Sequence, residues 1–136
     1  MVRTVAAISL GAIAGALSRY YLGLYLGQML GTQLPYGTLI INVTGCFVMG
    51  VMTAVSLGQV VTIHPELRLL LLTGFLGSYT TFSSYALDSV NLLQQQHLGA
   101  DLFYWAGSAL LGLLSLELGI VLAERVLNQV GRKRSE

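Results

Sequence analysis

The sequence predicts an all-α membrane protein with four transmembrane helices, of which the third is broken near the middle of the membrane. Of the 136 residues, 54% are hydrophobic and only 10% are charged, and the mean hydropathy is +0.72. Soluble domains carry about 25% charged residues, so these few charges cannot cover a water-facing surface. Glycines and hydroxyl side chains interrupt the third apolar segment, and this interruption predicts the break.

Four apolar segments are each long enough to cross a bilayer, for which about 20 mostly apolar residues suffice. Within a single transmembrane domain of residues 1–136, the expected spans are residues 4–27, 37–58, 67–95 and 102–127. The linkers between them are residues 31–35, 59–65 and 96–101. Because these linkers are short, consecutive spans should be antiparallel neighbours.

Basic residues gather at one predicted side of the membrane. An even number of spans places both termini on one side, together with the loop after the second span. The basic residues of that side are Arg3, Arg68, Arg125, Arg132, Lys133 and Arg134. The loops of the opposite side, residues 31–36 and 96–101, contain no Lys or Arg. By the positive-inside rule, both termini are predicted to be cytoplasmic.

Several function classes are not expected from this composition. The formal net charge is +1, and no basic face with interleaved aromatic residues indicates a nucleic-acid partner. No Ser–His–Asp set, metal-ligand cluster or glycine-rich phosphate loop indicates an enzyme. The single cysteine, Cys46, cannot form a disulfide within the chain, and we interpret it as a small packing residue.

The third span changes character along its length. The leucines of residues 69–72 give way to seven hydroxyl side chains between Ser78 and Tyr85. So many hydroxyls are unfavourable against lipid, and Gly74 and Gly77 weaken the helix just before them. A break is therefore predicted near residues 77–80, where protein or a water-filled cavity must satisfy the freed backbone. The alternative is an unbroken helix with a polar packing face.

Two further features bear on a site. Freed carbonyls at such a break suit a cation, and freed amides suit an anion. Asn42 lies in the middle of the second span, where its amide either joins two helices or lines a pathway as a two-proton donor. Glycines also recur at helical spacing, which predicts tight helix packing and an oligomer. They are Gly11, Gly15, Gly45, Gly50, Gly107 and Gly112.

Three stretches, residues 11–20, 35–45 and 73–83, resemble the Fluc (CrcB) family of fluoride channels. They occur in the family's order, and the similarity covers nearly the whole chain. The resemblance implies a channel of the bacterial inner (plasma) membrane that exports fluoride passively and so relieves fluoride toxicity. It also implies an antiparallel dimer with two pores and a structural sodium ion at the dimer interface.

The resemblance implies roles for particular residues. Backbone carbonyls of Gly77 and Thr80 would hold the sodium ion. Arg19 would either attract anions to a vestibule or lie at an interface. Independently of the resemblance, Asp88 is a functional candidate as an intramembrane acid, and it either faces a vestibule or lies at a helix-end interface. The implied fluoride pore residues are Asn42, Phe82, Tyr104 and Ser108, with Thr38 and Thr81 as weaker candidates.

The chain departs from the family pattern at two pore positions. Tyr85 occupies the place of a second pore phenylalanine, so its hydroxyl either donates to fluoride or narrows the pore. Gly112 stands where the polar track on the fourth span has a hydroxyl. The basic residues lie mostly at one predicted side, and this charge bias favours one orientation in the membrane. A dimer of two identical chains in opposite orientations is not expected from such a bias. Because the resemblance implies an antiparallel dimer, the chain is expected to pair either with itself or with a separately encoded, inverted homologue.

A second reading is a proton-coupled exporter of small cations, similar to the small four-span multidrug transporters. Such exporters need an acidic residue in the first span, where this chain has Arg19. Glu117, in the fourth span, would have to take that role. An intramembrane acid is a functional candidate by default, so this alternative stays open at the level of the sequence.

Overall fold

The computed structural model describes residues 1–31, 34–58, 63–96 and 98–134. Parts of all three predicted linkers, residues 32–33, 59–62 and 97, lie outside the described residues. Within the described ranges the regular secondary structure is entirely helical, with no strand. The all-helical prediction is therefore confirmed.

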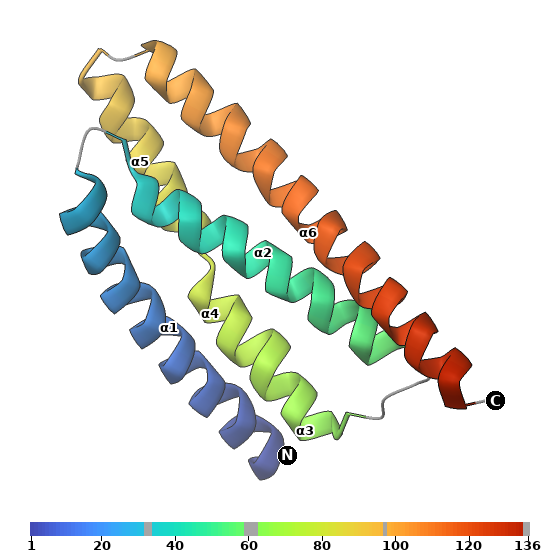
Figure 1. The fold of residues 1–136 in the computed structure, drawn as a ribbon. Coiled ribbons are helices and arrows are strands. Elements are labelled where there is room, and N and C mark those ends of the chain that lie inside the picture. Colours follow the sequence, from blue (N-terminus) through green and yellow to red (C-terminus); the bar gives the residue numbers. More distant parts are fainter. Residues whose placement is uncertain (32–33, 59–62, 97, 135–136) are drawn as a thin grey trace.

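The long helices are α1 (Val2–Leu30), α2 (Tyr36–Leu57) and α6 (Leu98–Arg134). Among the described residues, these three are the helices that are long and apolar enough to cross a membrane. The chain reverses direction at each connection, and both termini lie toward the same end of the bundle (Figure 1).

The predicted third span is divided into several pieces. They are α3 (Pro65–Arg68), the π-helix η1 (Leu69–Leu76), α4 (Gly77–Tyr79) and α5 (Phe82–Gln94). The first three run beside α1, and α5 continues toward the beginning of α6 (Figure 1). The break is present, and it lies at Thr80 and Thr81, at the end of the predicted window. The π-helix was not expected; such segments are rare and frequent at functional sites.

The helix α6 extends beyond the predicted fourth span, residues 102–127, at both ends. The helix begins at Leu98, within the predicted linker, and runs to Arg134 rather than ending near residue 127. Asp101 lies in its first turn, where the partial positive charge of a helix N-terminus favours a carboxylate. Beyond the apolar span, good helix formers such as Glu124 and Arg125 continue the helix.

Glycines allow α1 and η1 to touch through their backbones. A Cβ atom at Gly11 would collide with the Leu70 carbonyl, and one at Gly15 would collide with the Phe75 carbonyl. From the other side, a Cβ at Gly74 would meet the Ile8 carbonyl. The close approach predicted for Gly11 and Gly15 is thus confirmed.

The α2–α6 contact is equally close. A Cβ atom at Gly50 would meet the Leu116 carbonyl, and one at Gly119 would meet the Phe47 carbonyl. Gly107 does not take part, because no described atom lies within 4 Å of its Cβ position. The prediction that Gly107 packs closely therefore stays open for contacts with another subunit, whereas the contact of Gly119 was not foreseen.

Large apolar side chains cover much of the outer surface. Examples on α1 and α6 are Leu10, Ile13, Leu110, Leu113 and Leu114. A water-soluble monomer rarely exposes contiguous apolar surface of this extent. Together with the three candidate spans, this surface identifies a membrane protein whose outer face contacts lipid or another subunit.

Candidate functional site

The break between α4 and α5 has a defined backbone conformation. Thr80 ends α4 with extended torsion angles, φ −76° and ψ 156°, and Thr81 is also extended at φ −151° and ψ 122°. Thr81 is the N-cap of α5, because its hydroxyl oxygen accepts a hydrogen bond from the Ser84 N–H at 3.1 Å. A threonine N-cap satisfies one of the N–H groups that a helix start leaves free.

Asn42 of α2 holds this break from across the bundle. Its Oδ1 accepts a hydrogen bond from the Thr81 N–H at 2.8 Å, and its Nδ2 donates to the Thr81 carbonyl at 3.0 Å. Of the two alternatives for Asn42, the joining of helices is therefore realised in this structure. An amide nitrogen carries two protons, so the bond to Thr81 leaves a second proton for another acceptor.

The clamp by Asn42 releases backbone carbonyls from the regular helical pattern. In a continuous α-helix the N–H of Thr81 would bond to the Gly77 carbonyl, but it donates to Asn42 instead. The N–H of Ser84 would bond to the Thr80 carbonyl, but it donates to the Thr81 hydroxyl. The two carbonyls released in this way are those of Gly77 and Thr80, and carbonyl oxygens suit a hard cation.

An aromatic row begins at the break and reaches α6. The ring centroids of Phe82 and Tyr85 lie 5.6 Å apart, and those of Tyr85 and Tyr104 lie 5.5 Å apart. Phe82 is 79% exposed, although it directly follows the buried Thr81. The Tyr85 hydroxyl donates a hydrogen bond to the Trp105 carbonyl at 3.0 Å. In this structure the Tyr85 hydroxyl therefore ties α5 to α6.

Further polar contacts join α5 to the start of α6. The hydroxyl of the buried Tyr104 donates to Asp88 Oδ2 at 3.2 Å. The Ser89 hydroxyl donates to Asp101, which is also buried. Leu92 is the only residue of α5 that is fully buried among the described residues, so polar contacts carry much of the attachment of this half-helix.

Ser108 lies one turn beyond Tyr104 on α6. Its hydroxyl is buried and has no hydrogen-bond partner within the described part of the chain. Both residues line a small cavity of about 30 Å³ between α2 and α6. This volume accommodates one water molecule or an ion of similar size.

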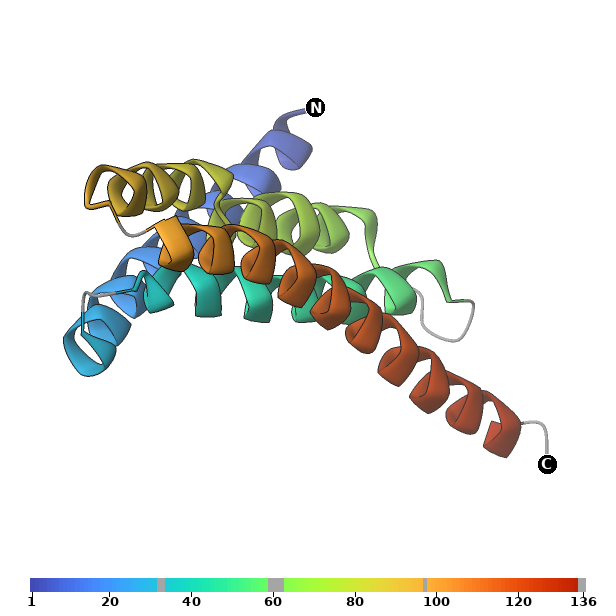
Figure 2. The same ribbon diagram turned by 90° about the horizontal axis from the view of Figure 1, so that it is seen from above.

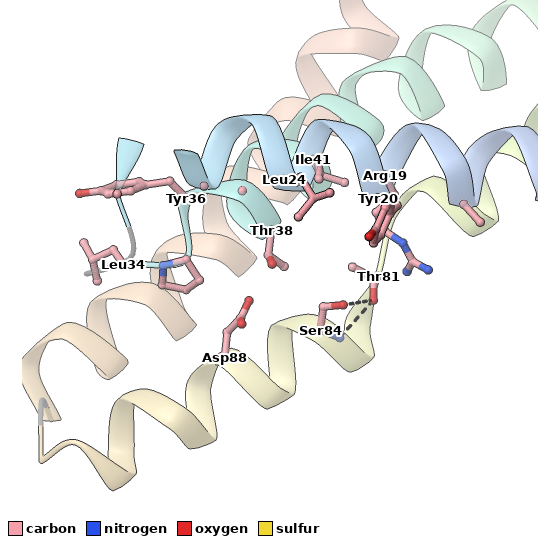
Figure 3. Close-up of a pocket in the computed structure, with 16 residues that line it drawn as sticks. Arg19, Tyr20, Leu24, Leu34, Tyr36, Thr38, Ile41, Thr81, Ser84 and Asp88 are labelled. Carbon is pink, nitrogen blue, oxygen red and sulfur yellow. Dashed lines mark hydrogen bonds between the residues drawn. The ribbon is translucent and has the colours of Figure 1, made fainter. Parts of the chain in front are cut away.

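A larger cavity of about 560 Å³ lies between α1, α2 and α5, and Figure 3 shows its lining. Arg19 and Thr81 lie near one another at one end, whereas Asp88 and Thr38 lie further along the cavity (Figure 3). Ser84, which sequence reasoning named only as one of several hydroxyls, also lines this cavity. Thr81 caps α5 through the Ser84 N–H, and a threonine at a helix start is a recognisable capping pattern. That pattern could have identified Ser84 from the sequence.

The cavity brings some of the predicted residues together and leaves others outside its lining. The predicted residues that line it are Arg19, Thr38, Thr81 and Asp88. Asn42 and Tyr104 are connected to it through their hydrogen bonds to Thr81 and Asp88. The other predicted residues neither line this cavity nor have a described side-chain bond to a residue that lines it: Phe82, Tyr85, Ser108, Gly77 and Thr80. Phe82 lies on the exposed outer surface of the chain, outside the lining of both cavities.

These features define a small polytopic membrane protein built around a broken helix and a cavity whose lining includes Arg19, Asp88 and several hydroxyl side chains. The family model described as "CrcB-like protein, Camphor Resistance (CrcB)" matches residues 6–120. The chain therefore belongs to the CrcB family.

Curated relatives are similar over nearly their full lengths. A protein of Trichormus variabilis named "Fluoride-specific ion channel FluC" is 57% identical over 121 residues, which cover 89% of this chain and 88% of the relative. Proteins with the same name from Synechococcus sp. and Synechocystis sp. are 55% and 45% identical, covering 86% and 91% of this chain and 89% and 95% of their own lengths. These names describe a channel and not an enzyme.

Proposed function

We propose that this chain is a subunit of a fluoride channel that lets the ion leave the cell passively and so relieves fluoride toxicity. The observation that carries the proposal is the break at Thr80 and Thr81, which Asn42 clamps beside a cavity containing Arg19. The names of the relatives support the choice of ion.

Fluoride is small and strongly hydrated, so a pathway must replace its water with hydrogen-bond donors. Hydroxyls of Thr38, Thr81 and Ser84 line the large cavity, and the unpartnered hydroxyl of Ser108 lies beyond Tyr104. Fast conduction requires several weak sites rather than one strong site. A series of single hydroxyls without a cluster of cations fits that requirement.

Arg19 and Asp88 give the cavity both signs of charge. The guanidinium of Arg19 raises the local concentration of anions, whereas the carboxylate of Asp88 accepts a hydrogen bond from Tyr104. The acid keeps an entering anion from being held too tightly near Arg19. Because exposed charges are screened by salt, an efflux rate of Arg19→Gln equal to that of the wild type at low salt would contradict the role of Arg19.

Phe82 supports the proposal of an antiparallel dimer with two pores. A ring edge carries the positive part of the aromatic quadrupole, so the exposed Phe82 ring can face an anion in a pore completed by a second subunit. The exposed residues Thr44 and Ser83 near the break carry hydroxyls, which also suit a protein-facing surface better than lipid. The second subunit is either a second copy or an inverted homologue, and the purified chain's oligomeric state and conductance distinguish these cases.

The remaining parts of the proposal concern the membrane and the ion at the interface. We place the segment Pro65–Gln94 as the third of four membrane passes, in the inner membrane, with both termini cytoplasmic where the chain adopts a single orientation. A reporter-fusion map with the C-terminus only outside would contradict this orientation. The Gly77 and Thr80 carbonyls, released by the clamp, fit a structural sodium ion that holds the two subunits together. No described feature favours a cation exporter, and Glu117 does not line the large cavity.

The test is fluoride efflux from liposomes that contain the purified chain, measured with a fluoride electrode. We expect passive efflux by the wild type and a decrease of at least about tenfold for Phe82→Ile, since a lost favourable ion–ring contact near 1.4 kcal/mol changes a rate by that factor. Leu87→Ile, on the exposed face of the same half-helix, is the matched control and should keep the wild-type rate. Absence of efflux from the chain alone, with efflux restored by an inverted homologue, would select the heterodimer. Absence of efflux in both cases would refute the function.

A further inference from the structure

The last turns of α6 extend beyond the helix that packs against it. At 1.5 Å per residue, the 37 residues of α6 span about 55 Å, whereas the hydrocarbon core of a bilayer is about 30 Å thick. Its packing partner α2 ends at Leu57, and the next residue, Gly58, lies close to the Leu127 side chain. The C-terminal part of α6 projects away from the other helices in Figure 2.

The end of α6, residues 122–134, is amphipathic and is called the α6 tail below. Leu122, Val126 and Val130 recur every four residues, so they form one stripe along the helix. They are 42%, 58% and 45% exposed. A polar stripe made of Glu124, Asn128 and Arg132 lies on the opposite side. If water surrounded the tail, an apolar stripe exposed over two helical turns would be unfavourable.

The charge of the α6 tail has one dominant sign. Its acidic residue is Glu124, and its basic residues are Arg125, Arg132, Lys133 and Arg134. Arg3 and Arg68 are also exposed. They belong to the start of α1 and to α3, which lie toward the same end of the bundle as the C-terminus (Figure 1). An excess of basic residues beside the end of a membrane span, combined with an apolar stripe, is typical of segments that lie at an anionic lipid surface.

We propose that the α6 tail docks on the headgroup region of the bilayer that the chain itself spans and binds anionic lipids there. The stripe of Leu122, Val126 and Val130 enters the boundary between headgroups and acyl chains. The net positive charge of the tail attracts the anionic lipids. This interaction is separate from ion conduction, and it anchors α6 at the depth at which α2 ends.

The test places an environment-sensitive dye on the apolar stripe of the full-length chain. Cys46 is the only cysteine, so Cys46→Ala combined with Val126→Cys gives one labelling position. We expect the dye emission to shift to the blue, and its quenching by neutral acrylamide to weaken several-fold, when phosphatidylglycerol is added to phosphatidylcholine vesicles. The triple change Arg132→Gln, Lys133→Gln and Arg134→Gln should abolish this lipid dependence.

A matched control uses Asn128→Cys, on the polar stripe, where the dye should stay accessible in both kinds of vesicle. Equal and strong quenching at position 126 in both lipids would mean that the tail lies in water, and it would overturn the proposal. Equal and weak quenching in both lipids would mean that protein covers the stripe, and it would overturn the proposal as well. If labelling disturbs the fold, native mass spectrometry of the unlabelled chain decides: the wild type should retain more phosphatidylglycerol than the triple variant, and equal retention refutes the proposal.

Discussion

Asn42 is joined to the backbone of Thr81 by two hydrogen bonds, one accepted and one donated, across 39 residues of sequence. A single amide side chain thus replaces the helical bonds that the break removes. In a continuous helix the Thr81 N–H would bond to the Gly77 carbonyl. Because Asn42 takes this N–H instead, the clamp releases the Gly77 carbonyl at the break. Several of the predictions below depend on this relationship.

Replacing Asn42 with alanine should leave the N–H and the carbonyl of Thr81 without their partner. Each such group in a buried site costs about 1–3 kcal/mol, so we expect a clearly lower melting temperature and a large loss of fluoride efflux. Asn91→Ala, at an exposed position on α5, is the control and should change neither quantity. A melting temperature of Asn42→Ala equal to that of the wild type would show that the clamp does not support the fold.

Replacing Gly15 with alanine tests the backbone contact between α1 and η1. The added Cβ would collide with the Phe75 carbonyl, and relief of such overpacking typically costs about 1–3 kcal/mol. Gly27 lies on the same helix with no described atom within 4 Å of its Cβ position, so Gly27→Ala should be neutral or slightly stabilising. Thermal unfolding of both variants in the same detergent provides the comparison. Similar losses in both would refute the packing argument.

The sequence predicted the apolar helices and the region of the break because both follow from local composition. Twenty apolar residues in a row have few alternatives to a membrane helix, and seven hydroxyls next to Gly77 conflict with one. The same local reasoning could not tell which face of α6 packs against α2, and so it did not single out Gly119.

Reasoning from local composition could not predict contacts between segments that are far apart in the sequence. Asn42 was recognised as important, but its partner is a backbone group of Thr81, which carries no signature in the sequence. The π-helix η1 is another example, since its path depends on how α1 packs against it through Gly11 and Gly15. The bond between Tyr85 and the Trp105 carbonyl likewise required the arrangement of α5 beside α6.

Replacing Tyr85 with phenylalanine distinguishes a tether from a fluoride donor. The change removes the hydrogen bond to the Trp105 carbonyl but keeps the ring between Phe82 and Tyr104. If the hydroxyl acts as a tether, stability should fall by about 1 kcal/mol while fluoride efflux stays close to the wild-type rate. Efflux that falls strongly with no change in melting temperature would instead assign the hydroxyl a direct contact with fluoride. Tyr25→Phe, exposed on α1, serves as the control.

Exchange of sodium for another cation tests the carbonyls of Gly77 and Thr80. A ligand that binds only the folded protein stabilises it by about 1.4 kcal/mol for each tenfold increase in concentration above its dissociation constant. We therefore expect the melting temperature to rise with sodium chloride and not with N-methylglucamine chloride at equal ionic strength. Asn42→Ala should weaken this sodium dependence, because the Thr81 N–H, once released from Asn42, can bond to the Gly77 carbonyl and compete with the ion. The same thermal response in both salts would contradict the binding of sodium by the released carbonyls.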